Sequence, residues 1–311
     1  MPWLKLILET TDADAPPIED CLIALGAAAV TLTDSADQPL FEPPLGTTPL
    51  WSQTRIEGLF DSSVDMDVAT NVLQHYFNRE LPNAKLNYKI EALEDRDWEK
   101  VWMDDFKPMC FGTRLWICPS WIQTPKDNAV TLKLDPGLAF GTGTHPTTAM
   151  CLEWLDSQAL DGKHVIDYGC GSGVLGIAAG LLGSEQVIAI DNDPQALIAS
   201  KDNCIKNQLQ DKLHTYSPER FQQQLHDKTS ALPFIEADIL IANILAGPLL
   251  ELAGTLTALV KPGGKLVLSG ILDHQAEEVM AAYASEWQFY PPQQKAGWCR
   301  LEAQRKTKID P

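Results

Sequence analysis

The chain has 311 residues, of which 45% are hydrophobic and 21% charged, and this profile is typical of a globular protein with a sizeable core. Its length favours two domains over one. The net charge of −18 argues against a protein that grips nucleic acid by its phosphates and favours a basic partner, such as a lysine-rich protein. No apolar run approaches the roughly 18 residues of a membrane span, so we expect no membrane association.

Seven cysteines are scattered through the chain without a C-x-x-C pair. The first residues lack the basic start and long apolar stretch of a secretory signal. We therefore expect reduced thiols, no metal site and a cytoplasmic location.

Residues 1–92 predict a small α+β domain. Strands are expected at 3–9, 28–33, 51–60 and 85–91, helices at 16–25 and 64–78, and a turn-rich loop at 34–49. The order β-α-β-β-α-β is typical of a ferredoxin-like domain. In the second helix, Val68, Val72, His75 and Tyr76 are predicted to lie near one face. Fourteen acidic and five basic residues, without a recognisable catalytic group, indicate a substrate-recognition module.

Residues 93–108 predict a linker helix between two domains. Trp98, Trp102 and Phe106 stand at i, i+4 and i+8, so they form one aromatic stripe along such a helix. We expect the stripe to pack on one or both of the flanking domains.

The second domain, residues 109–311, opens with predicted strands at 109–119 and 129–134 and a glycine- and threonine-rich loop before a helix at 147–155. Such a loop places backbone N–H groups and hydroxyls around a ligand, which makes Phe140, Thr142 and Thr148 candidate ligand contacts. His145 in this loop is either a catalytic base or a side chain that orders the loop or lines the cofactor pocket.

The stretch HVIDYGCGSGVLGIAAGLLGSEQVIAIDND, residues 164–193, predicts strand, glycine turn, helix and strand, which is half of a nucleotide-binding α/β domain. Its glycines allow a sharp turn and let a ligand lie directly on the main chain, with Gly169 and Gly171 as the candidate contacts. Asp191, at the tip of the second strand, is placed to accept hydrogen bonds from a ribose diol.

The glycine spacing also satisfies the G-x-G-x-x-G pattern of NAD-binding domains, with Asp191 about 20 residues on. Asp167 weighs against NAD, because a carboxylate at this position would meet its negative pyrophosphate. The same carboxylate suits a ligand with no phosphate and a cationic amino-acid end. The sequence D-x-G-C-G-S-G resembles the first motif of class I S-adenosylmethionine-dependent methyltransferases.

The remainder of the chain continues the α/β pattern. Strands are expected near 213 and at 237–242 and 265–269, helices at 194–207, up to 260 and at 271–284, and a terminal antiparallel hairpin from the apolar runs 287–290 and 298–303. The polar, poorly patterned stretch 209–235 suggests an insertion. This order matches the seven-stranded class I methyltransferase sheet with its last strand reversed, whereas an NAD-type sheet would stay parallel at that edge.

Asn243-Ile244-Leu245-Ala246 follows a predicted strand at the edge where such sheets bind ligands. It resembles the N-P-P-[YF] element of amine and amide N-methyltransferases, in which the Asn oxygen and a backbone carbonyl hold the target nitrogen. The replacement of Pro-Pro-aromatic by Ile-Leu-Ala favours a flexible aliphatic amine over a planar acceptor. Asn243, Ile244 and Leu245 are therefore the candidate catalytic residues.

The segments GTGTHPTT, IDYGCGSG, AIDNDPQA and NILAGPL together closely resemble the PrmA family, the methyltransferases of ribosomal protein L11, over nearly the whole chain. The resemblance implies transfer of methyl groups from S-adenosylmethionine to lysine ε-amines and an α-amine of that protein. It implies Thr148, Gly169, Asp191 and Asn243 as cofactor contacts and a small domain that holds the substrate. Another basic protein as acceptor, an NAD-binding oxidoreductase and a binding module without activity are the alternatives.

Overall fold

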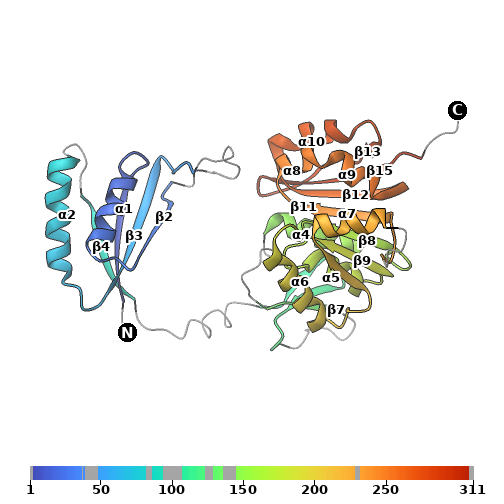
Figure 1. Ribbon diagram of the computed structural model, residues 1–311, viewed down its shortest axis with the longest axis horizontal. Coiled ribbons are helices and arrows are strands. Elements are labelled where there is room, and N and C mark those ends of the chain that lie inside the picture. The colour runs from blue at the N-terminus through green and yellow to red at the C-terminus, as the bar shows by residue number, and fades with distance from the viewer. Residues whose placement is uncertain are drawn as a thin grey trace. The chain divides into compact units, whose positions relative to one another are not determined.

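A computed structural model describes residues 3–36, 38, 48–81, 86–93, 107–122, 129–135, 145–227 and 232–307. The chain divides into two compact units, Met1–Val101 and Trp102–Pro311, and Figure 1 labels their helices and strands. Three predictions lie outside the described residues: the aromatic stripe of the linker helix, most of the loop at 34–49, and the candidate contacts Phe140 and Thr142.

The described part of the first unit is a four-stranded antiparallel sheet with two helices. Its elements are β1 (Trp3–Thr11), α1 (Ala15–Ala24), β2 (Ala29–Asp34), β3 (Gln53–Asp61), α2 (Met66–Glu80) and β4 (Tyr88–Leu93). The strands lie in the order β2-β3-β1-β4, and every neighbouring pair is antiparallel. The predicted order of elements is confirmed, with ends shifted by a few residues.

Local sequence signals account for where both helices begin. Pro16 and Pro17 occupy the first turn of α1, where a missing N–H leaves no hydrogen bond unmade. Asp65 caps α2, because its carboxylate accepts the N–H of Asp67 at 3.0 Å and that of Val68 at 3.1 Å.

Of the predicted face of α2, Tyr76 packs against the core of the first unit, but Val68 and Val72 do not. Val68 and Val72 are 57% and 47% exposed. The helix instead buries Leu73 and Phe77, which pack in the core of the first unit. Leu and Phe bury more apolar surface than Val, so the stripe that carries them faces the sheet.

The second unit contains a mixed sheet of eight strands. They are β8 (His164–Tyr168), β9 (Gln186–Ile190), β10 (Leu213–Tyr216), β11 (Ala237–Asn243), β12 (Val260–Leu272), β13 (Trp287–Phe289), β14 (Gln293–Lys295) and β15 (Trp298–Arg305). Seven lie in the order β10-β9-β8-β11-β12-β15-β13, and β14 pairs with β15. Neighbours from β10 to β12 are parallel, whereas β15 runs antiparallel to both β12 and β13. The predicted reversal at this edge is confirmed.

Helices pack on both faces of this sheet (Figure 1). They are α4 (Pro146–Ser157), α5 (Val174–Leu181), α6 (Pro194–Lys206), α7 (Pro218–His226), α8 (Ala246–Glu251), α9 (Ala253–Ala258) and α10 (Ala276–Tyr283), with the 3-10 helix η1 (Asp273–Gln275). Successive strand residues alternate between two cores: Val165 and Ile241 pack with α4 to α6, and Ile166 and Leu240 with α7 to α10. Strands buried on both faces are typical of a parallel α/β sheet.

A separate sheet of three strands precedes α4. Its strands, in spatial order, are β5 (Met109–Phe111), β6 (Leu115–Cys118) and β7 (Val130–Lys133). The prediction of one continuous strand at 109–119 is wrong, because the chain reverses at Gly112 and β5 pairs antiparallel with β6. Gly112 has φ +81°, a conformation that a residue with a Cβ rarely adopts.

The C-terminal half departs from the prediction in three places. The stretch 209–235 contains α7, which begins at a Ser217 cap and Pro218 but buries only Phe221, so its apolar period is weak. The helix expected up to 260 is two short helices, α8 and α9. The helix expected at 271–284 begins only at Ala276, because pairing with β15 carries β12 on to Leu272.

All seven cysteines are free thiols, as predicted. In the described ranges, no helix is long and apolar enough to cross a membrane. Nor do three or more His, Cys, Asp or Glu side chains of those ranges gather in a group that could hold a metal ion.

Candidate cofactor and acceptor site

The glycine turn after β8 is fastened to the end of β9. The N–H groups of Gly169 and Cys170 both donate to the Ile190 carbonyl, at 2.7 and 3.0 Å. Gly169 and Gly171 have φ values of +75° and +53°, which favour glycine. The Gly171 N–H donates to Asp191 Oδ2 at 2.8 Å. The glycine turn and Asp191 are therefore joined by a direct hydrogen bond, which was not predicted from the sequence.

The end of β11 lies against this turn. A Cβ added to Gly169 would lie 2.2 Å from Ile244 Cγ2, so the missing side chain admits Ile244. The contact follows from the sheet, since β8 and β11 are neighbouring parallel strands and both end at this edge. Leu245 stands next, at the start of α8, and is 42% exposed.

Asn243, the last residue of β11, links this strand to helix α4. Its side-chain Nδ2 donates to Thr148 Oγ1 at 3.2 Å, and Thr148 is buried in the first turn of α4. Because the amide nitrogen is engaged in this way, the amide oxygen of Asn243 is the group left to accept a hydrogen bond from another donor.

Ser269 and Gly270 support the same edge and were not predicted. Ser269 Oγ lies 3.4 Å from the Thr147 carbonyl and 3.3 Å from the Cys299 carbonyl. A Cβ on Gly270, which has φ +84°, would lie 2.4 Å from the Ile244 carbonyl oxygen. The only signal in the sequence was a glycine directly after an apolar strand.

His145 caps α4. Its Nδ1 lies 2.7 Å from Thr147 Oγ1 and accepts the Thr147 N–H at 3.4 Å. Its ring meets the edge of the Trp298 ring, with centroids 4.9 Å apart. Burial lowers the pKa of His145, which favours the neutral ring that such a cap requires. Of the predicted roles, this geometry supports the ordering of the loop.

Asp167 is the most unusual carboxylate of the site. It is 1% exposed, and Oδ2 accepts the Gly176 N–H at 2.8 Å. Its Oδ1 is buried and has no hydrogen-bond partner in the described part of the chain. Burial, and to a smaller degree the charge of Asp191, raises the pKa of Asp167 to about 7. A cationic donor would satisfy this oxygen, whereas a phosphate beside two carboxylates would be repelled.

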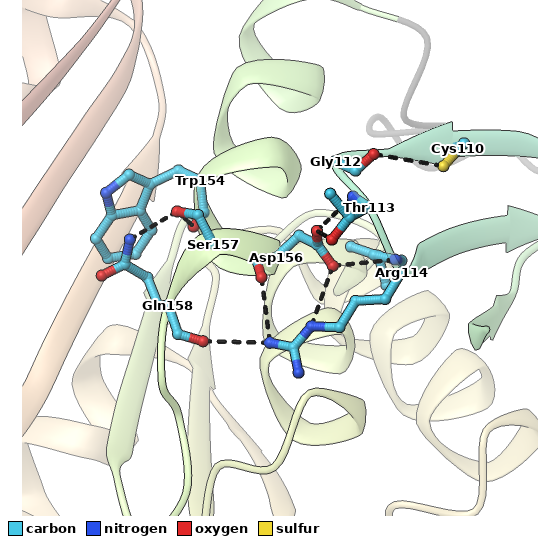
Figure 2. Close-up of polar contacts among 9 residues, drawn as sticks. Cys110, Gly112, Thr113, Arg114, Trp154, Asp156, Ser157 and Gln158 are labelled. Carbon is cyan, nitrogen blue, oxygen red and sulfur yellow. Dashed lines mark hydrogen bonds and ion pairs between the residues drawn. The ribbon is translucent and has the colours of Figure 1, made fainter. Parts of the chain in front are cut away.

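Figure 2 shows how the other end of α4 is held. Asp156 accepts the N–H of Thr113 at 2.6 Å, the Thr113 hydroxyl at 3.1 Å and the N–H of Leu115 at 3.0 Å. Arg114 Nε lies 3.4 Å from Asp156 Oδ1. A Cβ on Gly112 would lie 2.3 Å from Asp156 Oδ2. The turn between β5 and β6 therefore grips the helix whose first turn carries Thr148, a connection that the sequence did not reveal.

The structure brings most of the candidate residues to one edge of the sheet. They are Thr148, Asp167, Gly169, Gly171, Asp191, Asn243, Ile244 and Leu245. The remaining candidates, Phe140 and Thr142, lie outside the described residues.

Comparison with known proteins gives full-length matches. The family model for ribosomal protein L11 methyltransferase (PrmA) matches residues 2–306. Two proteins called ribosomal protein L11 methyltransferase are each 51% identical to this chain. The one from Azotobacter vinelandii aligns over 98% of this chain and that from Pseudomonas aeruginosa over 99%, in both cases over the relative's whole length.

A solved structure gives the same result at lower identity. The crystal structure of ribosomal protein L11 methylase from Lactobacillus delbrueckii subsp. bulgaricus superposes with a TM-score of 0.55 at 29% identity. The match covers 65% of this chain and 100% of that one, and it supports an α/β methyltransferase fold with a mixed sheet. By its sequence and its fold, this chain belongs to the ribosomal protein L11 methyltransferase (PrmA) family.

Proposed function

We propose that this chain transfers methyl groups from S-adenosylmethionine to lysine ε-amines and an α-amine of ribosomal protein L11. Membership of the family supports the reaction and the cofactor, and the name of the relatives supports the acceptor. The observation that carries the proposal is a single site in which Ile244 packs on Gly169 while the neighbouring Asn243 is oriented by Thr148.

The cofactor-binding residues of the proposal are Asp167, Gly169, Gly171, Asp191 and Thr148, with Phe140 and Thr142 of the preceding loop. The Oδ1 of Asp167, which is buried and has no partner among the described residues, fits the ammonium of S-adenosylmethionine, and the Asp191 carboxylate fits its ribose diol. The N–H groups of Gly169 and Gly171 are already engaged. Gly169 would therefore contribute by admitting Ile244 to the site, and Gly171 by the space that an absent side chain leaves. S-adenosylmethionine, when bound, supplies an electrophilic methyl group on a sulfonium.

Asn243, with the backbone carbonyls of Ile244 or Leu245, would orient the acceptor amine through its N–H groups. A lysine near pKa 10.4 is mostly protonated at pH 7, so the site must favour loss of the ammonium proton to solvent. Partial desolvation among Ile244, Leu245 and their neighbours lowers the pKa of such an amine. The nitrogen lone pair would then form the new C–N bond as the C–S bond breaks, and the methylated amine would leave as an ammonium that carries the positive charge of the former sulfonium. Positioning can supply about 7–11 kcal/mol of such a barrier.

No dedicated base is needed in this scheme, which gives His145 a structural role. We expect His145→Ala to keep measurable turnover at high S-adenosylmethionine, with a weaker helix cap. If the variant bound S-adenosylmethionine normally but transferred no methyl group, His145 would have to be the base.

The finer architecture belongs to the same proposal. The path of seven strands, β10 to β13, corresponds to the class I methyltransferase sheet, and residues 109–311 form the catalytic domain. Residues 1–92 form a ferredoxin-like domain that holds the basic substrate, and residues 93–108 link the two. The order β2-β3-β1-β4 and the excess of acidic side chains in this first domain support the assignment.

Mass spectrometry of purified ribosomal protein L11 after incubation with this protein and S-adenosylmethionine tests the proposal, with Asn243→Ala as the control. We expect mass gains in steps of one methylene that the control loses. Gains on a different basic protein, and none on L11, would keep the reaction and change the substrate. No gain on any protein would overturn the proposed reaction.

A further inference from the structure

Strand β10 has an outer edge that no other strand of the described residues covers. The carbonyls of Lys212 and Tyr216 accept the N–H groups of Val187 and Asp191, at 2.8 and 3.2 Å. In a parallel pair, alternate residues point their backbone groups to opposite sides, so Leu213 and Thr215 point theirs outward. The Leu213 N–H donates to the Leu209 carbonyl. The Leu213 carbonyl has only a 4.0 Å contact from the Cys204 thiol. This carbonyl and both backbone groups of Thr215 are therefore available to hydrogen-bond another strand.

A pocket of about 310 Å³ runs along this edge, between α6 and α7. Thr215 and Tyr216 of β10 form one wall, Cys204 and Ile205 of α6 another, and Arg220 of α7 a third. The outer edge of β10 is therefore hollowed.

Two positive charges at this pocket are uncompensated. Among the lysines and arginines of the described residues, the side chains of Lys107, Lys133, Lys201 and Arg220 make no ion pair or hydrogen bond, and the last two line this pocket. The chain carries 42 acidic residues against 24 lysines and arginines, so cations elsewhere readily find a carboxylate. Two unpaired cations in one pocket favour a ligand that brings its own carboxylates.

The rim of the pocket also carries apolar surface. Ile198 and Ile205 of α6 are 62% and 48% exposed. Their spacing of seven residues puts them on one face of the helix, and Lys201 stands on the same face between them. The edge therefore offers backbone hydrogen bonds, cations and apolar contacts side by side, which is the combination that strand addition uses.

We propose that the outer edge of β10 binds an extended acidic peptide segment of a partner protein as an added strand. Thr215 and the Leu213 carbonyl would bond its backbone, Lys201 and Arg220 would pair with its carboxylates, and Ile205 would pack on its apolar side chains. This site does not suit the proposed methyl acceptor, because its two positive charges would repel a lysine-rich substrate. The partner would therefore be a protein other than the substrate.

The test is fluorescence anisotropy with the full chain and a labelled eight-residue peptide of alternating glutamate and valine. We expect binding that Lys201→Glu/Arg220→Glu and Thr215→Pro each weaken by about tenfold or more, a loss near 1.4 kcal/mol. Thr215→Pro removes an outward N–H without touching the bonds to β9. Thermal unfolding of each variant checks its fold, and the charge variant suffices if the proline variant fails to fold.

Lys107→Glu/Lys133→Glu is the matched control, since it changes the charge by the same amount at the other two unpaired cations. It should bind the peptide about as well as the native chain, and a lysine–valine peptide should not bind. Absence of binding, equal losses in the control, or full competition by free glutamate would overturn the strand site. The measurement uses neither S-adenosylmethionine nor ribosomal protein L11, so failure of methyl transfer leaves its outcome unaffected.

Discussion

Two carboxylates of the second unit, Asp156 and Asp167, are both buried, and the chain surrounds them differently. Asp156 is 6% exposed and accepts hydrogen bonds from Thr113 and Leu115 on both of its oxygens, with Arg114 beside it (Figure 2). Asp167 is 1% exposed and accepts one N–H, from Gly176, while its second oxygen has no partner in the described residues.

The difference separates a structural carboxylate from one suited to a ligand. Burial costs an ionised group its hydration, and hydrogen bonds from the protein can replace it. Around Asp156 the replacement is complete, so its charge stabilises the contact of the β5–β6 turn with α4. Around Asp167 the replacement is half complete, so the folded chain bears a cost that a cationic ligand would relieve.

Removal of the saturated carboxylate should have the largest effect. Asp156→Ala leaves the buried Leu115 N–H and the Thr113 donors without an acceptor and removes the carboxylate beside Arg114, which keeps its bonds to the carbonyls of residues 156 and 158. We expect the free energy of unfolding to fall by about 3–5 kcal/mol. Urea unfolding followed by circular dichroism measures this loss.

Glu153→Ala is the control for Asp156→Ala, on the same helix. Glu153 pairs with Lys295 at 3.2 Å, and both side chains are about half exposed, so this change should cost at most about 1 kcal/mol. Equal losses in the two variants would mean that burial and saturation of Asp156 do not matter.

Crowding of the Asp156 carboxylate by a side chain at position 112 should have the next largest effect on stability. Gly112→Ala places a Cβ 2.3 Å from Asp156 Oδ2 on a residue with φ +81°. We expect a loss of about 2–3 kcal/mol in the free energy of unfolding, in part from backbone strain and in part from displacement of Asp156.

Gly162→Ala isolates the strain. Gly162 has φ +69°, and a Cβ there would meet nothing within 4 Å. The variant should lose about 1 kcal/mol by the same urea measurement. If Gly112→Ala were no worse than Gly162→Ala, the close contact with Asp156 would carry no energy.

Neutralisation of Asp167 should weaken the binding of the ligand without weakening the fold. Asp167→Asn keeps an acceptor for the Gly176 N–H but loses the charge. We expect S-adenosylmethionine to bind about 10- to 100-fold more weakly by calorimetry, as for loss of a hydrogen bond between charged groups. The free energy of unfolding should not fall, because the variant removes a buried charge whose hydration the protein replaces only in part.

An exposed carboxylate of the same unit, Asp161, gives the control, since Asp161→Asn should leave the affinity unchanged. A loss of stability in Asp167→Asn as large as that in Asp156→Ala would erase the distinction between the two groups. Unchanged affinity would remove Asp167 from the cofactor site and reopen the NAD alternative.

The same contrast explains what the sequence could predict. The glycine turn, β9 and Asp191 are signalled by neighbouring residues, and the second strand predicted within residues 164–193 is present as β9, Gln186–Ile190. Asp156 depends on donors 41 to 43 residues away, which no local pattern reports. Likewise the buried face of α2 and the length of β12 are decided by which partner each element packs or pairs with.

The pH dependence of binding is the smallest of these effects and tests Asp167 without a mutation. Its pKa, raised by burial to about 7, means that the free protein protonates this group as the pH falls through 7. An ammonium ligand requires the carboxylate, so the affinity for S-adenosylmethionine should fall by up to about tenfold from pH 7.5 to pH 6, where the ligand's own amine stays mostly protonated. Calorimetry at both pH values measures this change in affinity, with Asp167→Asn as the variant that lacks the titrating group.

The stability of the free protein should change with pH in the opposite direction to the affinity. A carboxyl whose folded pKa exceeds its unfolded value, near 3.9, contributes most below pH 4, and that contribution is lost as the pH rises through 7. Binding and stability that weakened together towards low pH would therefore point to a titrating group other than Asp167.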